Sequence, residues 1–236
     1  MDPNLPITHI ILDLDGLLID SEILFDAAIN EILKPFNKTM NFEVKEYCLG
    51  KKLPESIAII TKMLKVPLDE TDFISQYQKI KHEVLRDIQL KAGANKLINY
   101  FWKNKIPMAI ATGSSDESYT IKTKDYNDLF SKIHHKVCSG SDKLVKQTKP
   151  APDIFIEAAN RFLSSLPLSP RQVLIFEDAA NGVTAGLAAN MKVVWVPDSR
   201  VNTSNFKNHP DVMILTSLEK FSPSKYGLPM SSEFIH

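Results

Sequence analysis

The sequence predicts an α/β fold: a Rossmann-like, three-layer core built on a parallel sheet, with an all-helical domain inserted near its start. Short apolar runs alternate with segments at helical spacing, as in parallel sheets that carry helices on both faces. The long stretch between the first two runs contains helical patterns and no convincing strand. We therefore expect a core formed by residues 1–19 and 91–236 and a helical domain formed by residues 20–90.

The first apolar run is Ile10-Ile11-Leu12, whose residue types suit a strand buried on both faces. Asp13 and Asp15 follow it directly, and Gly16 then allows the chain to turn away. Ligands of open α/β sheets bind at the carboxyl ends of the strands, so these acids lie where chemistry is expected. Two carboxylates this close need a stabilising partner, such as a metal ion or a shared proton.

The inserted stretch contains segments of helical pattern. Asp20 or Ser21 caps the first helix, which Pro35 ends. Pro54 begins the second helix, because proline is favoured in the first helical turn. A third helix follows residues 69–72. The insertion is therefore expected to be all-helical.

The rest of the chain alternates between strand and helix patterns. We expect further strands at residues 107–111, 137–138, 173–176, 193–196 and 212–215, with helices beginning near residues 93, 118, 152 and 181. The segment after Pro223 contains Ser and Pro and is expected to be a tail.

The composition is that of an ordinary globular protein of 236 residues. Its 28 Lys and Arg residues balance 28 Asp and Glu residues, which argues against nucleic acid or an anionic membrane as the main partner. No basic segment followed by an apolar run begins the sequence, and no apolar run is long enough to cross a bilayer. Cys48 and Cys138 lack metal-type spacing and are expected to be reduced thiols. We expect a cytoplasmic protein and, by default, a monomer.

Polar side chains that could take part in catalysis or ligand binding follow several of the predicted strands. Because the carboxyl ends of parallel strands share one edge of a sheet, residues far apart in sequence can converge there. Carboxylate oxygens suit a hard cation such as Mg²⁺, while hydroxyl, amide and ammonium groups suit a phosphate. The residues concerned are Asp13, Asp15, Thr112, Gly113, Ser114, Lys149, Glu177 and Asp178.

Each of these motifs has an ordinary explanation when taken alone. A single Asp-x-Asp is usually a solvated turn, and Thr-Gly-Ser-Ser is usually a loop that caps a helix. Lys149 alone would be a surface lysine, and Glu177-Asp178 could be favourable acids at a helix N-terminus. Their occurrence together, in this order and beside predicted strands, favours one common site.

Together the motifs resemble the haloacid dehalogenase superfamily of phosphohydrolases, in the subgroup with a helical cap inserted after the first strand. The resemblance covers nearly the whole chain and rests on residues 13–22, 111–114, 149–155 and 176–182. It implies that residues 1–19 and 91–236 form the catalytic core and that residues 20–90 form the cap.

The resemblance further implies a Mg²⁺-dependent phosphatase that acts through an aspartyl-phosphate intermediate. Asp13 would be the nucleophile and Asp15 the general acid–base. Mg²⁺ would be bound by Asp13, by the Asp15 carbonyl and by Asp178, with Glu177 at the metal directly or through water. The phosphoryl oxygens would be held by Thr112, Gly113, Ser114 and Lys149.

The expected substrate is a small phosphorylated metabolite. Residues 49–52, 149–155 and 196–198 resemble animal pseudouridine-5′-phosphatase-like proteins, which suggests pseudouridine 5′-phosphate. A glycerol- or sugar-phosphate is the alternative substrate. Gly50 and Lys51 lie on a cap loop and are expected to reach the active site, although a solvated basic pair explains Lys51 equally well.

Other functions fit only part of the pattern. Sugar-phosphate mutases of this superfamily carry a His where this chain has Phe25, which cannot transfer protons, so hydrolysis is favoured. A phospho-Asp signalling domain uses similar residues, but its acidic metal pair precedes a separate acceptor strand and it has no helical insertion. An idle binding protein would not need all the chemical groups that are present here.

Overall fold

The computed structural model describes residues 5–48, 53–84, 88–163, 165–230 and residue 234. The chain divides into two compact units, which we call the sheet unit (residues 1–19 and 90–236) and the helical unit (residues 20–89). Within the described ranges, no helix is both long and apolar enough to cross a membrane.

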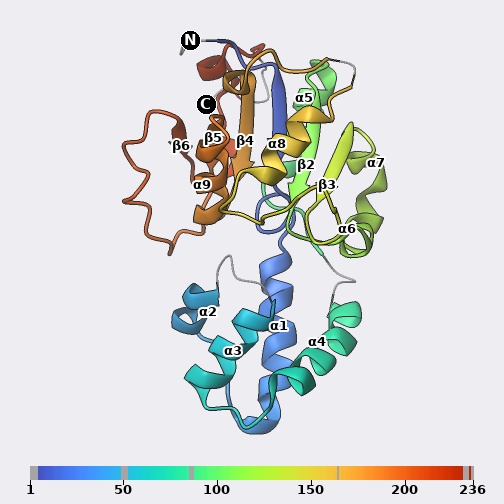
Figure 1. Ribbon diagram of the computed structural model, residues 1–236, viewed down its shortest axis with the longest axis vertical. Helices are drawn as coiled ribbons and strands as arrows, with labels where there is room; N and C mark the ends of the chain where they lie inside the picture. Colours follow the sequence, from blue (N-terminus) through green and yellow to red (C-terminus); the bar gives the residue numbers. More distant parts are fainter. Residues whose placement is uncertain (1–4, 49–52, 85–87, 164, 231–233, 235–236) are drawn as a thin grey trace. The chain divides into compact units, whose positions relative to one another are not determined.

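The sheet unit is built on a parallel sheet of six strands in the order β3-β2-β1-β4-β5-β6 (Figure 1). The three central strands are buried along their whole length, which explains their uninterrupted apolar runs. The predicted α/β class with a parallel sheet is therefore confirmed. The strands are β1 (His9–Leu12), β2 (Met108–Thr112), β3 (His135–Cys138), β4 (Val173–Glu177), β5 (Lys192–Trp195) and β6 (Val212–Ile214).

β1 lies between β2 and β4, and its register brings distant segments to one edge of the sheet. Leu12 is opposite Ile110 of β2 and Phe176 of β4. The next residue, Asp13, donates its backbone N–H to the Phe176 carbonyl over 3.0 Å. The chain order reverses at β1, and ligands of such sheets bind outside the carboxyl ends at this reversal.

Helices cover both faces of the sheet, and alternate strand residues supply the two halves of the core. The sheet unit contains α5 (Ala94–Lys103), α6 (Asp116–Thr123), α7 (Asn127–Phe130), α8 (Asp153–Asn160) and α9 (Ala180–Ala188). α8 and α9 pack on the face that includes Ile11 and Ile175 (Figure 1). On the face that includes Phe176, this ring contacts Phe101 of α5, with centroids 5.9 Å apart.

The helical unit has its own apolar core. Its elements are α1 (Ser21–Leu33), a 3₁₀ turn (Lys34–Phe36), α2 (Phe42–Cys48), α3 (Leu53–Leu64) and α4 (Glu70–Val84). Ile29, Val44, Ile57 and Phe73, one from each helix, belong to one buried cluster. The short α2 was not predicted, because seven residues give too few turns for a helical period to stand out.

The described residues after Pro223 pack against the rest of the sheet unit and do not form the tail that the sequence predicts. Pro223–Tyr226 forms a 3₁₀ turn, and the Tyr226 ring stacks on Phe221 with centroids 5.6 Å apart. The Tyr100 hydroxyl donates to the Pro229 carbonyl over 2.7 Å, and Phe234 is buried against the Tyr100 ring. Single apolar residues anchor this segment, and they form no periodic pattern in the sequence.

Candidate active site

The turn after β1 depends on Gly16. Its φ of +82° lies in the left-handed region, which is strained for residues with a side chain. A Cβ atom at this position would also lie 2.1 Å from the Asp178 Oδ2 atom. Gly16 therefore lets the end of β1 turn sharply and lets the Asp178 carboxylate approach the backbone next to Asp15.

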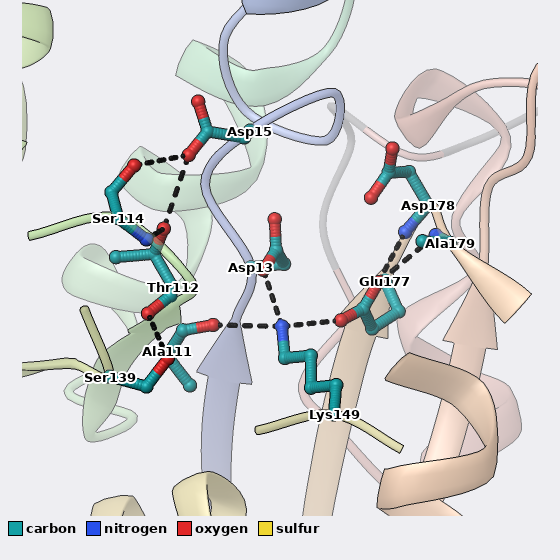
Figure 2. A network of polar contacts seen from close by, with 10 residues as sticks. All are labelled: Asp13, Asp15, Ala111, Thr112, Ser114, Ser139, Lys149, Glu177, Asp178 and Ala179. Atoms are coloured by element: carbon teal, nitrogen blue, oxygen red, sulfur yellow. Dashed lines mark hydrogen bonds and ion pairs between the residues drawn. The ribbon is translucent and has the colours of Figure 1, made fainter. Parts of the chain in front are cut away.

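Lys149 connects the ends of three strands. Its Nζ atom lies 2.5 Å from Asp13 Oδ1, 2.6 Å from Glu177 Oε1 and 3.1 Å from the carbonyl oxygen of Ala111 (Figure 2). Its side chain is 11% exposed, and those of Asp13 and Glu177 are 8% and 1% exposed. One cation is thus shared by two carboxylates that are sheltered from water.

Burial and the neighbouring carboxylates both disfavour the ionised form of Asp13. Burial raises the pKa of Asp13 to about 7, and the charges of Glu177 and Asp15 act in the same direction, while Lys149 opposes them. Burial lowers the pKa of Lys149, but Asp13 and Glu177 outweigh that effect, so its pKa is raised overall. Lys149 therefore stays charged, and the ionised form of Asp13 would be stabilised by a further cation.

Both carboxylate oxygens of Glu177 are engaged by protein donors. Oε1 accepts from Lys149, and Oε2 accepts from the backbone N–H groups of Asp178 and Ala179, each over 3.0 Å. A Cβ atom at Gly182 would lie 1.8 Å from Oε1, so the glycine makes room for the carboxylate. These contacts favour a role in holding Lys149 over the predicted role at the metal.

The predicted phosphate donors of β2 surround Asp15. The Ser114 hydroxyl donates to Asp15 Oδ2 over 2.8 Å, and the Thr112 hydroxyl donates to the same oxygen over 3.2 Å (Figure 2). Thr112 is fully buried, whereas the intervening Gly113 is exposed and has no atom within 4 Å of a Cβ position. Gly113 thus lies in an open part of the loop between the two hydroxyl-bearing residues.

Lys122 also contacts Asp15, and sequence reasoning did not find it. Its Nζ atom lies 2.5 Å from Asp15 Oδ1 and 2.8 Å from Ser114 Oγ. It belongs to α6, which begins directly after the loop that carries Ser114. The only sequence signal is a lysine in the helix that follows the second strand, and such lysines are usually exposed.

The structure brings together the predicted residues of the core. The side chains or backbone of Asp13, Asp15, Thr112, Ser114, Lys149, Glu177 and Asp178 gather at the carboxyl ends of β1, β2 and β4 (Figure 2). Gly50 and Lys51, predicted to read the substrate, lie outside the described residues.

The residues present fit a hard divalent cation. In the described part of the chain, no group of three or more His, Cys, Asp or Glu side chains is arranged to hold a metal ion. Mg²⁺ commonly takes only one or two carboxylates, however, and completes its shell with backbone carbonyls, phosphate oxygens and water. Asp13 and Asp178 supply two carboxylates, and burial raises the pKa of Asp13, so a bound cation would favour its ionised form.

Comparison with known proteins identifies the family of this chain. A family model of haloacid dehalogenase-like hydrolases matches residues 10–196. The chain is 40% identical over 223 residues to a probable pseudouridine-5′-phosphatase of Drosophila melanogaster, with 94% of this chain and 95% of that protein covered. It is also 40% identical over 227 residues to (DL)-glycerol-3-phosphatase 2 of Arabidopsis thaliana, with 94% and 92% covered.

A solved structure shows the same fold. The crystal structure of a haloacid dehalogenase family hydrolase from Deinococcus radiodurans R1, with bound phosphate and sodium, matches with a TM-score of 0.75. The match covers 90% of this chain and 92% of that one, at 20% sequence identity. The chain therefore belongs to the haloacid dehalogenase-like hydrolase family, as its motifs predict. Within this family it is a phosphatase.

Proposed function

We propose that this phosphatase hydrolyses the phosphomonoester of a small metabolite through an aspartyl-phosphate formed on Asp13, with Mg²⁺ as cofactor. The observation that carries the proposal is the buried Asp13 carboxylate, 2.5 Å from Lys149, with a second carboxylate two residues further along the chain. A covalent intermediate divides one difficult substitution into two easier ones.

Asp13 and Asp15 perform the two halves of the reaction. In the first half, an oxygen of Asp13 attacks phosphorus, the bond to the leaving oxygen breaks, and that oxygen takes a proton from Asp15. In the second half, Asp15 takes a proton from a water molecule, whose oxygen attacks the same phosphorus. The bond between phosphorus and Asp13 then breaks, which releases inorganic phosphate and restores the Asp13 carboxylate and the protonated Asp15.

The neighbouring donors hold the phosphoryl group. Lys149, the Thr112 and Ser114 hydroxyls and the Gly113 amide are the groups that would contact its oxygens and offset the charge that develops there. Glu177 fixes the Lys149 ammonium group through the 2.6 Å contact. The donors come from different strand ends, so the rigid sheet sets their spacing.

Asp13, Asp178 and the Asp15 carbonyl would hold Mg²⁺. When bound, the cation shields the negative charges of Asp13 and the phosphoryl group from each other. The burial of Asp13, which disfavours its ionised form unless a cation is near, and the close approach of Asp178 to Gly16 support this assignment.

The helical unit would act as the cap that selects the leaving group. Its Phe25 ring packs edge-on against Tyr77, with centroids 5.7 Å apart, and offers no group that transfers a proton. A mutase must hand protons to and from a bound sugar, so Phe25 supports hydrolysis over mutase chemistry.

Pseudouridine 5′-phosphate is the substrate that we favour. The 40% identity to the probable pseudouridine-5′-phosphatase supports it, and the equal identity to a glycerol-3-phosphatase makes glycerol 3-phosphate the second candidate. The substrate and the need for Mg²⁺ can be tested together by measuring phosphate release with Mg²⁺ and with chelator. The panel of substrates is pseudouridine 5′-phosphate, uridine 5′-phosphate, glycerol 3-phosphate and glucose 6-phosphate. We expect the highest kcat/KM for pseudouridine 5′-phosphate and no release with chelator. Equal rates with and without chelator would overturn the role of Mg²⁺, and a higher kcat/KM for glycerol 3-phosphate would overturn the substrate.

A further inference from the structure

Asp15 is held by a second, separate cation in the sheet unit. Lys122 Nζ lies 2.5 Å from Asp15 Oδ1, and the Ser114 hydroxyl, 2.8 Å from Lys122, donates to the other Asp15 oxygen. The Lys122 side chain is 11% exposed, as sheltered as that of Lys149. Lysines seldom lie this deep without a partner, so the contact with Asp15 accounts for its burial.

The two acids of the motif are therefore held by different lysines. Lys149 engages Asp13, and Lys122 engages Asp15 from α6. Figure 2 shows the Asp15 carboxylate directed toward Ser114 and Thr112, while the Asp13 carboxylate faces Lys149.

We propose that Lys122 is a positioning residue for Asp15, fixing the rotation of the acid that protonates the leaving group. The inference rests on the proposed function, in which Asp15 is the general acid. An Asp side chain has several staggered rotamers, and contacts to both of its oxygens select one of them. Proton transfer requires the acid to lie within hydrogen-bond reach of the leaving oxygen. If Asp15 is no longer fixed in one rotamer, protonation of the leaving group becomes slower.

Comparing substrates with different leaving groups shows whether Lys122 acts through Asp15. An alkoxide is a poor leaving group and needs the proton, whereas 4-nitrophenolate departs as a stable anion without one. A defect in the acid therefore slows alkyl phosphates much more than 4-nitrophenyl phosphate. A defect in folding or in phosphate binding slows both alike.

The test compares kcat/KM of Lys122→Met and the wild type, in saturating Mg²⁺, on 4-nitrophenyl phosphate and on the alkyl phosphate that the wild type hydrolyses fastest. We expect a loss of at least about tenfold on the alkyl phosphate and of less than about threefold on the aryl phosphate. Lys122→Arg, which keeps the charge, should retain the alkyl activity within about threefold. Lys124→Met, at an exposed lysine two residues further on, is the matched control and should match the wild type.

Equal losses on both phosphates, or an unchanged or higher rate of Lys122→Met on the alkyl phosphate, would overturn the inference. Should Lys122→Met fail to fold in a thermal unfolding measurement, Lys122→Gln supplies the same comparison. A wild type that hydrolyses neither phosphate would overturn the proposed function itself, which separates that failure from a failure of the role of Lys122.

Discussion

The Lys149 ammonium group lies 2.5 Å from Asp13 Oδ1, and both side chains are sheltered from water. This contact joins the end of β1 to a loop more than a hundred residues later in the chain. It gives the buried Asp13 carboxylate a cation, and in the mechanism that we propose the same ammonium group would contact the phosphoryl oxygens.

Replacing Lys149 should lower the catalytic activity more strongly than the stability of the fold. Lys149→Met removes the cation that, in the mechanism we propose, offsets charge on the phosphoryl group, and we expect kcat to fall by about 10²–10³-fold. Lys146→Met, at an exposed lysine three residues earlier, is the matched control and should keep wild-type kcat. Steady-state phosphate release measures both variants, and similar rates for the two would contradict the role of Lys149.

Glu177 and Asp178 should differ in their effect on the metal. Because Glu177 is engaged by Lys149 and two backbone N–H groups, Glu177→Gln should lower kcat by about tenfold while the apparent Mg²⁺ affinity stays within about twofold. Asp178→Asn should weaken the apparent Mg²⁺ affinity by at least about tenfold. Mg²⁺ titrations of the activity distinguish the two residues. A comparable loss of Mg²⁺ affinity in Glu177→Gln would show that Glu177 helps to bind the metal.

Alanine should be poorly tolerated at one glycine of the site and well tolerated at another. Gly16→Ala puts a Cβ atom 2.1 Å from Asp178 Oδ2 at a φ of +82°, and we expect it to destabilise the fold by about 1–3 kcal/mol and to abolish most of the activity. Gly113→Ala meets no atom within 4 Å and keeps its amide, so its stability and kcat should stay near those of the wild type. Thermal unfolding and activity of both proteins test this, and equal tolerance at the two positions would contradict the turn geometry.

The raised pKa of Asp13 predicts a pH-dependent stability in the metal-free protein. Asp13 ionises near pH 4 in the unfolded chain, but burial raises its pKa to about 7 in the folded protein. Between these values the folded state keeps a proton that the unfolded state has released, so this group makes stability fall as the pH rises from about 4 to about 7, and the loss then levels off. Asp13→Asn lacks this titration.

Thermal unfolding in chelator should therefore show Asp13→Asn more stable than the wild type at pH 8, by at least about 1 kcal/mol or roughly 2–4 °C in Tm. The difference should shrink toward pH 4, and added Mg²⁺ at pH 8 should raise the Tm of the wild type more than that of the variant. A variant less stable than the wild type at pH 8 would show that Lys149 offsets the burial of Asp13 in full.

Much of this site could be predicted because its residues follow the strongest signals in the chain. The apolar runs that become β1, β2 and β4 are continuous because these strands are buried on both faces, and each is followed directly by polar residues. The convergence of Asp13, Thr112 and Glu177 then follows from parallel strand order alone.

The features that were missed depend on tertiary contacts. Lys122 is recognised only once α6 is packed beside the end of β2, because nothing local marks a buried lysine. The C-terminal segment is held by single anchors, such as Phe234 against Tyr100, which leave no period in the sequence. The partners of Glu177 could not be predicted either. Its position next to Asp178 suggests a shared metal, whereas the structure shows a contact with Lys149.

Phosphate release by the wild type and by Asp13→Asn tests whether Asp13 is the nucleophile. The substitution keeps the shape of the side chain but removes the charged oxygen that attacks phosphorus. With pseudouridine 5′-phosphate and Mg²⁺, we expect the wild type to turn over continuously and the folded Asp13→Asn protein to release phosphate at less than about a hundredth of that rate. Equal rates for the two proteins would contradict the account.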